Sequence, residues 1–143
     1  MTQEEKELLL KDLCARLPYG VICTDLRHGD SKITEVDTED GLVYCYDFDE
    51  YIKVDDCRLY LRPMSSMTED EKDELYDWGW EVNGDDICSG ASTDANNVYQ
   101  TYQKDLHDAR WLINWLNSHH FDFRGLIEKS LAIVASEEMY KNE

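Results

Sequence analysis

The residues with the clearest potential for metal chemistry are two adjacent histidines, His119 and His120, with Asp122 two positions further on. Imidazole nitrogens and a carboxylate are ligands that transition metals accept in proteins. Adjacent helical side chains point about 100° apart, and zinc-binding helices usually carry their two histidines four residues apart. The spacing therefore favours histidines at a helix C-terminus, where cationic groups are stabilised, over a metal site.

A second group is an acidic cluster in residues 69–81, in which Lys72 is the one base. Its members are Glu69, Asp70, Glu71, Asp73, Glu74, Asp77 and Glu81. Calcium loops place their oxygen ligands at fixed positions of a D-x-[DN]-x-[DN]-G run, which this segment lacks. Two interpretations remain, a solvated helix face or a surface that binds a basic protein.

The chain as a whole is strongly acidic, with 14 Lys and Arg against 32 Asp and Glu and a net charge of −18. Asp55 and Asp56 lie beside Lys53, with Asp47, Asp49 and Glu50 close by in the chain, and nucleases use carboxylates with a lysine to hold magnesium at a phosphate. The negative field, however, repels nucleic acids and anionic membranes. We therefore expect no direct nucleic acid or membrane partner, and a basic protein as the favoured one.

Aromatic residues form a fourth group, with nine Tyr and four Trp in 143 residues. Trp111 and Trp115 are one helical turn apart, and we expect them to protrude beyond a buried face that contains Ile113. Tyr and Trp build cores, but they also dominate interface hot spots. The two tryptophans are thus predicted to bind a partner protein, or a second copy of the chain through residues 109–116.

Five cysteines occur without a CxxC pair, at positions 14, 23, 45, 57 and 88. An odd number of such cysteines is typical of reduced thiols in the cytoplasm. The N-terminus does not have the composition of a signal peptide, and no apolar run approaches the length of a membrane span. Glycine-rich phosphate loops and GxSxG elbows are also absent, so no cofactor is expected.

The pattern of predicted helices and strands that position these groups indicates an α+β fold in a single domain, residues 1–143. In residues 1–63, Thr2 and Glu5 have the spacing of a capping box at the start of a helix. Short runs with tight turns follow, including alternation over residues 42–48 and a hairpin signal at Glu39-Asp40-Gly41. We expect an N-terminal helix followed by a small antiparallel meander or SH3-like barrel.

Residues 64–143 are predicted to be mainly helical. Two overlapping capping boxes, Ser66 with Glu69 and Thr68 with Glu71, precede a helix that ends near residue 78. Residues 79–94 indicate a loop or an irregular hairpin. A long helix over residues 95–118 and a short one over 126–133 complete the prediction.

Three segments carry a resemblance: residues 13–21 (LCARLPYGV), 60–68 (YLRPMSSMT) and 115–129 (WLNSHHFDFRGLIEK). In these segments the chain resembles an uncharacterised protein family of Bacteroides-type gut bacteria and their phages and mobile elements. The resemblance departs at Ser130, where relatives tend to have glycine, and across residues 80–95. It implies a phage or mobile-element context, and since the family has no assigned activity, no functional residue is carried over.

These observations lead to two hypotheses from different classes. The first is a non-enzymatic, cytoplasmic protein-interaction module, which in one version mimics nucleic acid charge and blocks a basic DNA-binding site. The alternative is a metal-dependent hydrolase whose Asp and His groups converge only in the fold.

Overall fold

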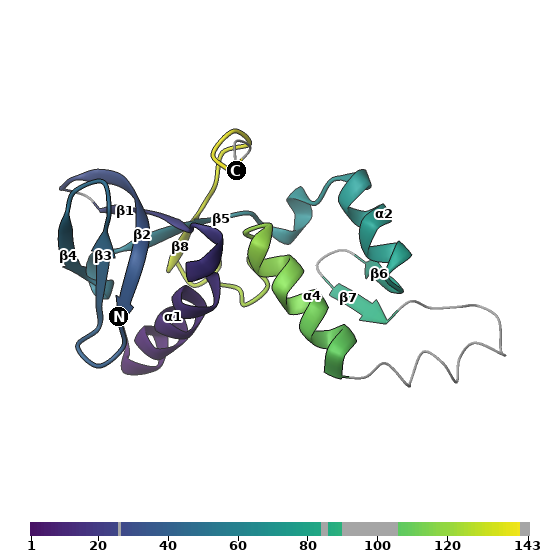
Figure 1. Cartoon of the computed structure of the whole chain (residues 1–143), viewed down its shortest axis with the longest axis horizontal. Helices are drawn as coiled ribbons and strands as arrows, with labels where there is room; N and C mark the ends of the chain where they lie inside the picture. Colours follow the sequence, from purple (N-terminus) through teal and green to yellow (C-terminus); the bar gives the residue numbers. More distant parts are fainter. Residues whose placement is uncertain (26, 84–85, 90–105, 141–143) are drawn as a thin grey trace, which may run out of the picture. The chain divides into compact units, whose positions relative to one another are not determined.

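The computed structural model describes residues 1–25, 27–83, 86–89 and 106–140 (Figure 1). The chain divides into two compact units, each described by itself. Residues Met1–Arg62 and Leu116–Glu143 form the first, here called the sheet unit. Residues Pro63–Trp115 form the second, here called the helix unit. In the described ranges no helix has the length and apolar character needed to cross a membrane.

The sheet unit begins with the predicted N-terminal helix, α1 (Gln3–Arg16). Its capping box is formed in both directions: the Glu5 backbone N–H donates to Thr2 Oγ1 at 3.1 Å, and the Thr2 N–H donates to Glu5 Oε1 at 2.9 Å. These bonds satisfy two backbone donors that the first turn of a helix leaves open. The helix passes into a 3₁₀ turn, Leu17–Tyr19, and the chain reverses at Gly20, whose φ of +76° suits glycine.

A six-stranded sheet forms the body of this unit. Its strands are β1 (Ile22–Asp25), β2 (Gly29–Asp37), β3 (Leu42–Cys45), β4 (Glu50–Lys53), β5 (Arg58–Leu61) and β8 (Ala132–Val134). The spatial order is β4-β3-β2-β1-β5-β8. Strands β1 to β4 form an antiparallel meander, β5 pairs antiparallel with β1, and β8 pairs parallel with β5. The α+β prediction with an antiparallel meander is confirmed, and the barrel is open because its two edge strands, β4 and β8, do not pair.

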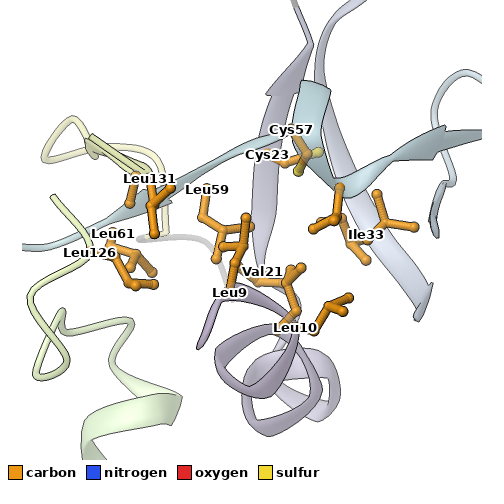
Figure 2. Packing of buried hydrophobic residues seen from close by; sticks show 14 of the residues in the cluster. Leu9, Leu10, Val21, Cys23, Ile33, Cys57, Leu59, Leu61, Leu126 and Leu131 are labelled. Carbon is orange, nitrogen blue, oxygen red and sulfur yellow. The ribbon is translucent and has the colours of Figure 1, made fainter. Parts of the chain in front are cut away.

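The hydrophobic core packs one face of α1 against the inner face of the sheet (Figure 2). Every second residue of β1, β3 and β5 is buried, and in β3 this agrees with the alternation predicted over residues 42–48. The cluster contains leucines from α1, alternate residues of the strands, and two leucines from the C-terminal segment: Leu9, Leu10, Leu13, Val21, Cys23, Ile33, Val43, Cys45, Leu59, Leu61, Leu126 and Leu131. Burial of each leucine side chain contributes about 2 kcal/mol.

The predicted helix over residues 126–133 is wrong. Residues 126–130 form turns, with Ser130 at φ +62°, and the chain then enters β8. The Asp122 carboxylate accepts the backbone N–H groups of Leu126 and Ile127 at 2.8 and 2.9 Å, which holds the turn. Because Ile and Val are β-branched, the next residues favour an extended strand.

The alternating run over residues 42–48 is also shorter as a strand than predicted, since β3 ends at Cys45. A tight turn follows, in which the Phe48 N–H donates to the Cys45 carbonyl oxygen at 3.2 Å and Asp49 adopts φ +53°. Tyr44 nevertheless forms the cross-strand aromatic pair that the alternation indicates, with Tyr51 of β4 at a centroid distance of 5.0 Å.

The helix unit contains the predicted acidic helix, α2 (Glu69–Asp77). Of the two overlapping capping boxes, the helix uses Thr68 with Glu71, whose reciprocal bonds measure 2.9 and 3.2 Å. Ser66 lies in a 3₁₀ turn, Met64–Ser66, and its hydroxyl donates to the Pro63 carbonyl oxygen at 2.7 Å. The helix therefore begins two residues later than the first box would place it.

The segment predicted as a loop or irregular hairpin forms a two-stranded antiparallel hairpin, β6 (Trp80–Asn83) with β7 (Asp86–Ser89). The last described helix is α4 (Leu106–Ser118), which is the C-terminal part of the long helix expected over residues 95–118. Residues 95–105 of that prediction, and residues 84–85 and 90–94 of the loop prediction, lie outside the described residues.

Candidate functional site

The acidic face of α2 is the most strongly charged surface that the described helices present. At about 100° per residue, five of its acids fall within an arc of about 140° on the side opposite Leu75, the buried residue of the helix. These five residues, here called the α2 acidic face, are Glu69, Asp70, Asp73, Glu74 and Asp77, and all are exposed. The remaining acid, Glu71, faces away and serves the capping box. Lys72 Nζ lies 3.3 Å from Glu69 Oε1 and neutralises only one of the five.

An aromatic group lies at the end of the same helix. Trp78 directly follows α2, and its ring stacks on Trp111 of α4 with centroids 4.5 Å apart and planes inclined by 23°. Trp111 in turn stacks on Trp115 at 6.4 Å. These three residues, here called the tryptophan stack, all belong to the helix unit. Trp78 is 52% exposed, so the outer ring of the stack faces solvent.

The prediction that Trp111 and Trp115 protrude beyond a buried face containing Ile113 is wrong. Trp115 is 6% exposed and Trp111 is half-buried, whereas Ile113, which was expected in the core, is 40% exposed. The buried face of α4 runs through Leu112 and Trp115, so Ile113 points away from it. The exposed member of the stack is Trp78. Trp78 directly follows a helix that has Leu75 as its one buried residue, and this position was the sequence signal for its exposure.

The two histidines and Asp122 have structural contacts. The ring of His119 lies with Nδ1 3.1 Å from Ser118 Oγ. His120 is buried at the end of α4 with φ +64°, and its ring stacks on Tyr140 at 3.5 Å. Both oxygens of Asp122 accept backbone N–H groups. Within the ranges that the structure describes, no three His, Cys, Asp or Glu side chains are placed to hold a metal ion.

Three of the five cysteines meet inside the sheet unit. Cys23, Cys45 and Cys57 are fully buried, and the Sγ atoms of Cys23 and Cys45 lie 3.9 Å apart. Burial raises the pKa of Cys45 to about 12. Hydrogen bonding to Cys57, followed by burial, raises the pKa of Cys23 far above its ordinary value. Cys14 and Cys88 are exposed.

These thiols should therefore differ in reactivity. A thiol-specific chromogenic disulfide reagent at about pH 8 is expected to modify two cysteines of the native protein rapidly and the other three only after denaturation in urea, because the thiolate is the reactive form. The Cys14→Ser, Cys88→Ser double variant should lose the rapid phase. A rapid phase that persists in this variant would show that the buried thiols are accessible.

Comparison with known proteins identifies no relative: no protein-family model, no curated protein and no solved structure matches this chain.

Proposed function

We propose that the chain is a non-enzymatic protein-interaction module, of phage or mobile-element origin, that binds a basic protein through the α2 acidic face and Trp78. One observation carries this proposal: a half-exposed tryptophan, held in place by stacking, directly follows a helix face with five exposed carboxylates.

The two parts of this surface make different contributions to binding. Trp is enriched among the residues that dominate interface energies, because its large ring buries much apolar area with few rotatable bonds. Stacking on Trp111 fixes the Trp78 ring before binding, which lowers the entropy lost on association. The carboxylates attract a basic partner and raise the association rate, an effect that salt weakens.

In the most specific version of the proposal, the chain mimics nucleic acid charge. The α2 acidic face repeats carboxylates on successive helical turns, about 5.4 Å apart along the axis. A surface of Lys and Arg that recognises the phosphates of DNA would meet a comparable row of negative charge here. DNA-binding proteins and free thiols share the cytoplasm, which we propose as the compartment. A homodimer through residues 109–116 stays a prediction.

Retention of partners on the immobilised protein tests the proposal. Proteins from a bacterial lysate should bind wild type at about 50 mM salt and elute near 500 mM, since screening weakens the charge attraction. The same proteins should be depleted on the Trp78→Ala variant. If no protein distinguishes wild type from Trp78→Ala at low salt, the proposal fails.

A further inference from the structure

The sheet unit contains a cleft of about 750 Å³ at the place where the barrel stays open. Its walls come from β4, from β1, β5 and β8, and from the turns that follow β1 and β4. Strand β4 pairs with none of β1, β5 and β8. The charged residues that line the cleft are Asp25, Arg27, His28, Glu50, Lys53, Asp55, Asp56 and Arg58.

His28 is held in a fixed orientation in this cleft. Its Nδ1 lies 2.8 Å from Oδ2 of Asp25, whose side chain is 7% exposed, and its ring stacks on Phe48 at 4.9 Å. The hydrogen bond from His28 lowers the pKa of Asp25. The ionised carboxylate can only accept, so Nδ1 carries a hydrogen and donates it. The other ring nitrogen, Nε2, therefore points away from Asp25.

Nε2 lies 3.0 Å from a second carboxylate, that of Glu50 on β4, to which the ring donates a hydrogen bond when both of its nitrogens are protonated. The Glu50 side chain is 56% exposed. A pair with such an exposed member contributes little to stability. The Glu50 oxygen thus occupies a position that an oxygen of a bound anion can take in its place. Because the two ring nitrogens face opposite directions, Asp25 and Glu50 do not converge with His28 on one metal ion.

Three cationic side chains line the same cleft. Arg27 and Lys53 line the cleft, and among the described residues neither side chain makes an ion pair. The Arg58 Nη1 atom is held by the carbonyl oxygens of Asp55 and Cys57, at 3.0 and 2.9 Å. Three of the 14 Lys and Arg residues thus border one cleft of a chain that carries 32 acids.

The acids that also line the cleft restrict the size of the ligand. Asp25 already accepts the His28 ring and the Arg27 backbone N–H. Asp55 and Asp56 are exposed at the wall, where solvent screens them. Together with the net charge of −18, they oppose a polyanion such as nucleic acid. A small anion that contacts only the cations and Nε2 avoids most of this repulsion.

We propose that this cleft binds a small anionic molecule through a phosphate or carboxylate group. The anionic oxygen displaces Glu50 from His28 Nε2 and lies beside Lys53 and Arg27. This site lies in the sheet unit and is independent of the α2 acidic face, so it adds a ligand to the proposed protein-binding function.

Titration of the full chain with inorganic phosphate, adenosine monophosphate and citrate tests the proposal, with sodium chloride at matched ionic strength as the reference. Chemical shifts of the His28 ring report binding. At least one of the three anions should bind with a dissociation constant below about 10 mM. The phosphate-bearing probes and citrate separate the two anion classes. No saturable shift with any of the three, or an equal shift with chloride, would overturn the proposal.

Three variants at exposed positions sharpen the test. Lys53→Met should weaken binding about threefold or more, since it removes a cation from the cleft. Glu50→Gln should strengthen it by a similar factor, because it removes the competing carboxylate. Lys11→Met, which removes a positive charge from exposed α1, should change little. Weakening by Glu50→Gln, or equal effects of Lys53→Met and Lys11→Met, would contradict the site.

Discussion

The Asp12→Ala substitution is expected to lower the free energy of unfolding by about 3–5 kcal/mol, because it leaves a buried arginine without its counter-ion. Asp12 and Arg16 are both fully buried, and Arg16 Nε lies 2.7 Å from Asp12 Oδ2. The other carboxylate oxygen lies 2.6 Å from Nη1 of Arg124. Urea denaturation followed by circular dichroism measures the loss.

The size of this effect follows from what the ion pair connects. Arg16 Nη2 also donates to the carbonyl oxygen of Phe121 at 2.6 Å, and the Arg124 guanidinium lies 4.3 Å from the centroid of the Phe123 ring. The Asp12 carboxylate on α1 thus binds Arg16, which contacts Phe121, and also Arg124. Both interactions connect α1 to the segment after α4. Loss of Asp12 removes the charge balance and the link between segments more than 100 residues apart.

Two further variants separate these contributions. Arg124→Met should cost only about 1 kcal/mol, since Arg124 is partly exposed, water can take the place of its guanidinium beside Asp12, and Arg16 still balances the Asp12 charge. Adding Arg16→Met to Asp12→Ala should restore part of the lost stability, because the unpaired buried charge is then absent. An Asp12→Ala protein within 1 kcal/mol of wild type would show that the pair is not a principal stabilising contact.

The Trp78→Ala substitution is expected to weaken binding of the basic partner about 30-fold or more, the effect of removing an interface hot spot of about 2 kcal/mol. The exposed ring supplies the apolar centre of the proposed surface, and the carboxylates of α2 surround it with charge. Calorimetry or surface plasmon resonance with a partner retained by the wild-type protein measures the change. The larger part should appear in the dissociation rate.

Matched substitutions serve as controls for Trp78. Trp78→Phe keeps an aromatic ring on Trp111 and should lose much less affinity. Ile113→Ala removes a comparably exposed apolar side chain from α4 and should have little effect, because the proposed surface does not include it. A Trp78→Ala protein that remains folded and binds as tightly as wild type would remove Trp78 from the interface.

Much of the fold was predictable because its signals are local. Thr2 with Glu5 and Thr68 with Glu71 satisfy donors within four residues, and the alternation over β3 indicates one buried face. Strand β8 was missed because its partner β5 lies about 70 residues away in the chain, and apolar residues near position 131 fit a helix and a strand equally well.

The functional surfaces were likewise predictable only where their signals are local in the sequence. The α2 acidic face is visible in the sequence, since five acids on one arc of a helix need only helical geometry. The exposure of Trp78 and the burial of Trp115 depend on tertiary packing, which periodicity alone does not fix. The sequence drew attention to Lys53, Asp55 and Asp56 in the cleft wall, but it did not predict the cleft itself, because Glu50 of β4 and His28 after β1 meet only in the folded sheet. The spacing of Asp25 and His28 near the end of a strand was its single local signal.

If the proposed function is right, the negative charge of α2, and not net charge alone, binds the partner. Two triple variants that each remove three negative charges distinguish these possibilities. The first changes the α2 acidic face: Asp70→Asn, Asp73→Asn and Asp77→Asn. The second changes exposed acids of the sheet unit: Glu39→Gln, Asp40→Asn and Glu128→Gln. We predict that only the first loses the partner retained at about 50 mM salt. Equal retention by both variants, or equal loss, would contradict the account.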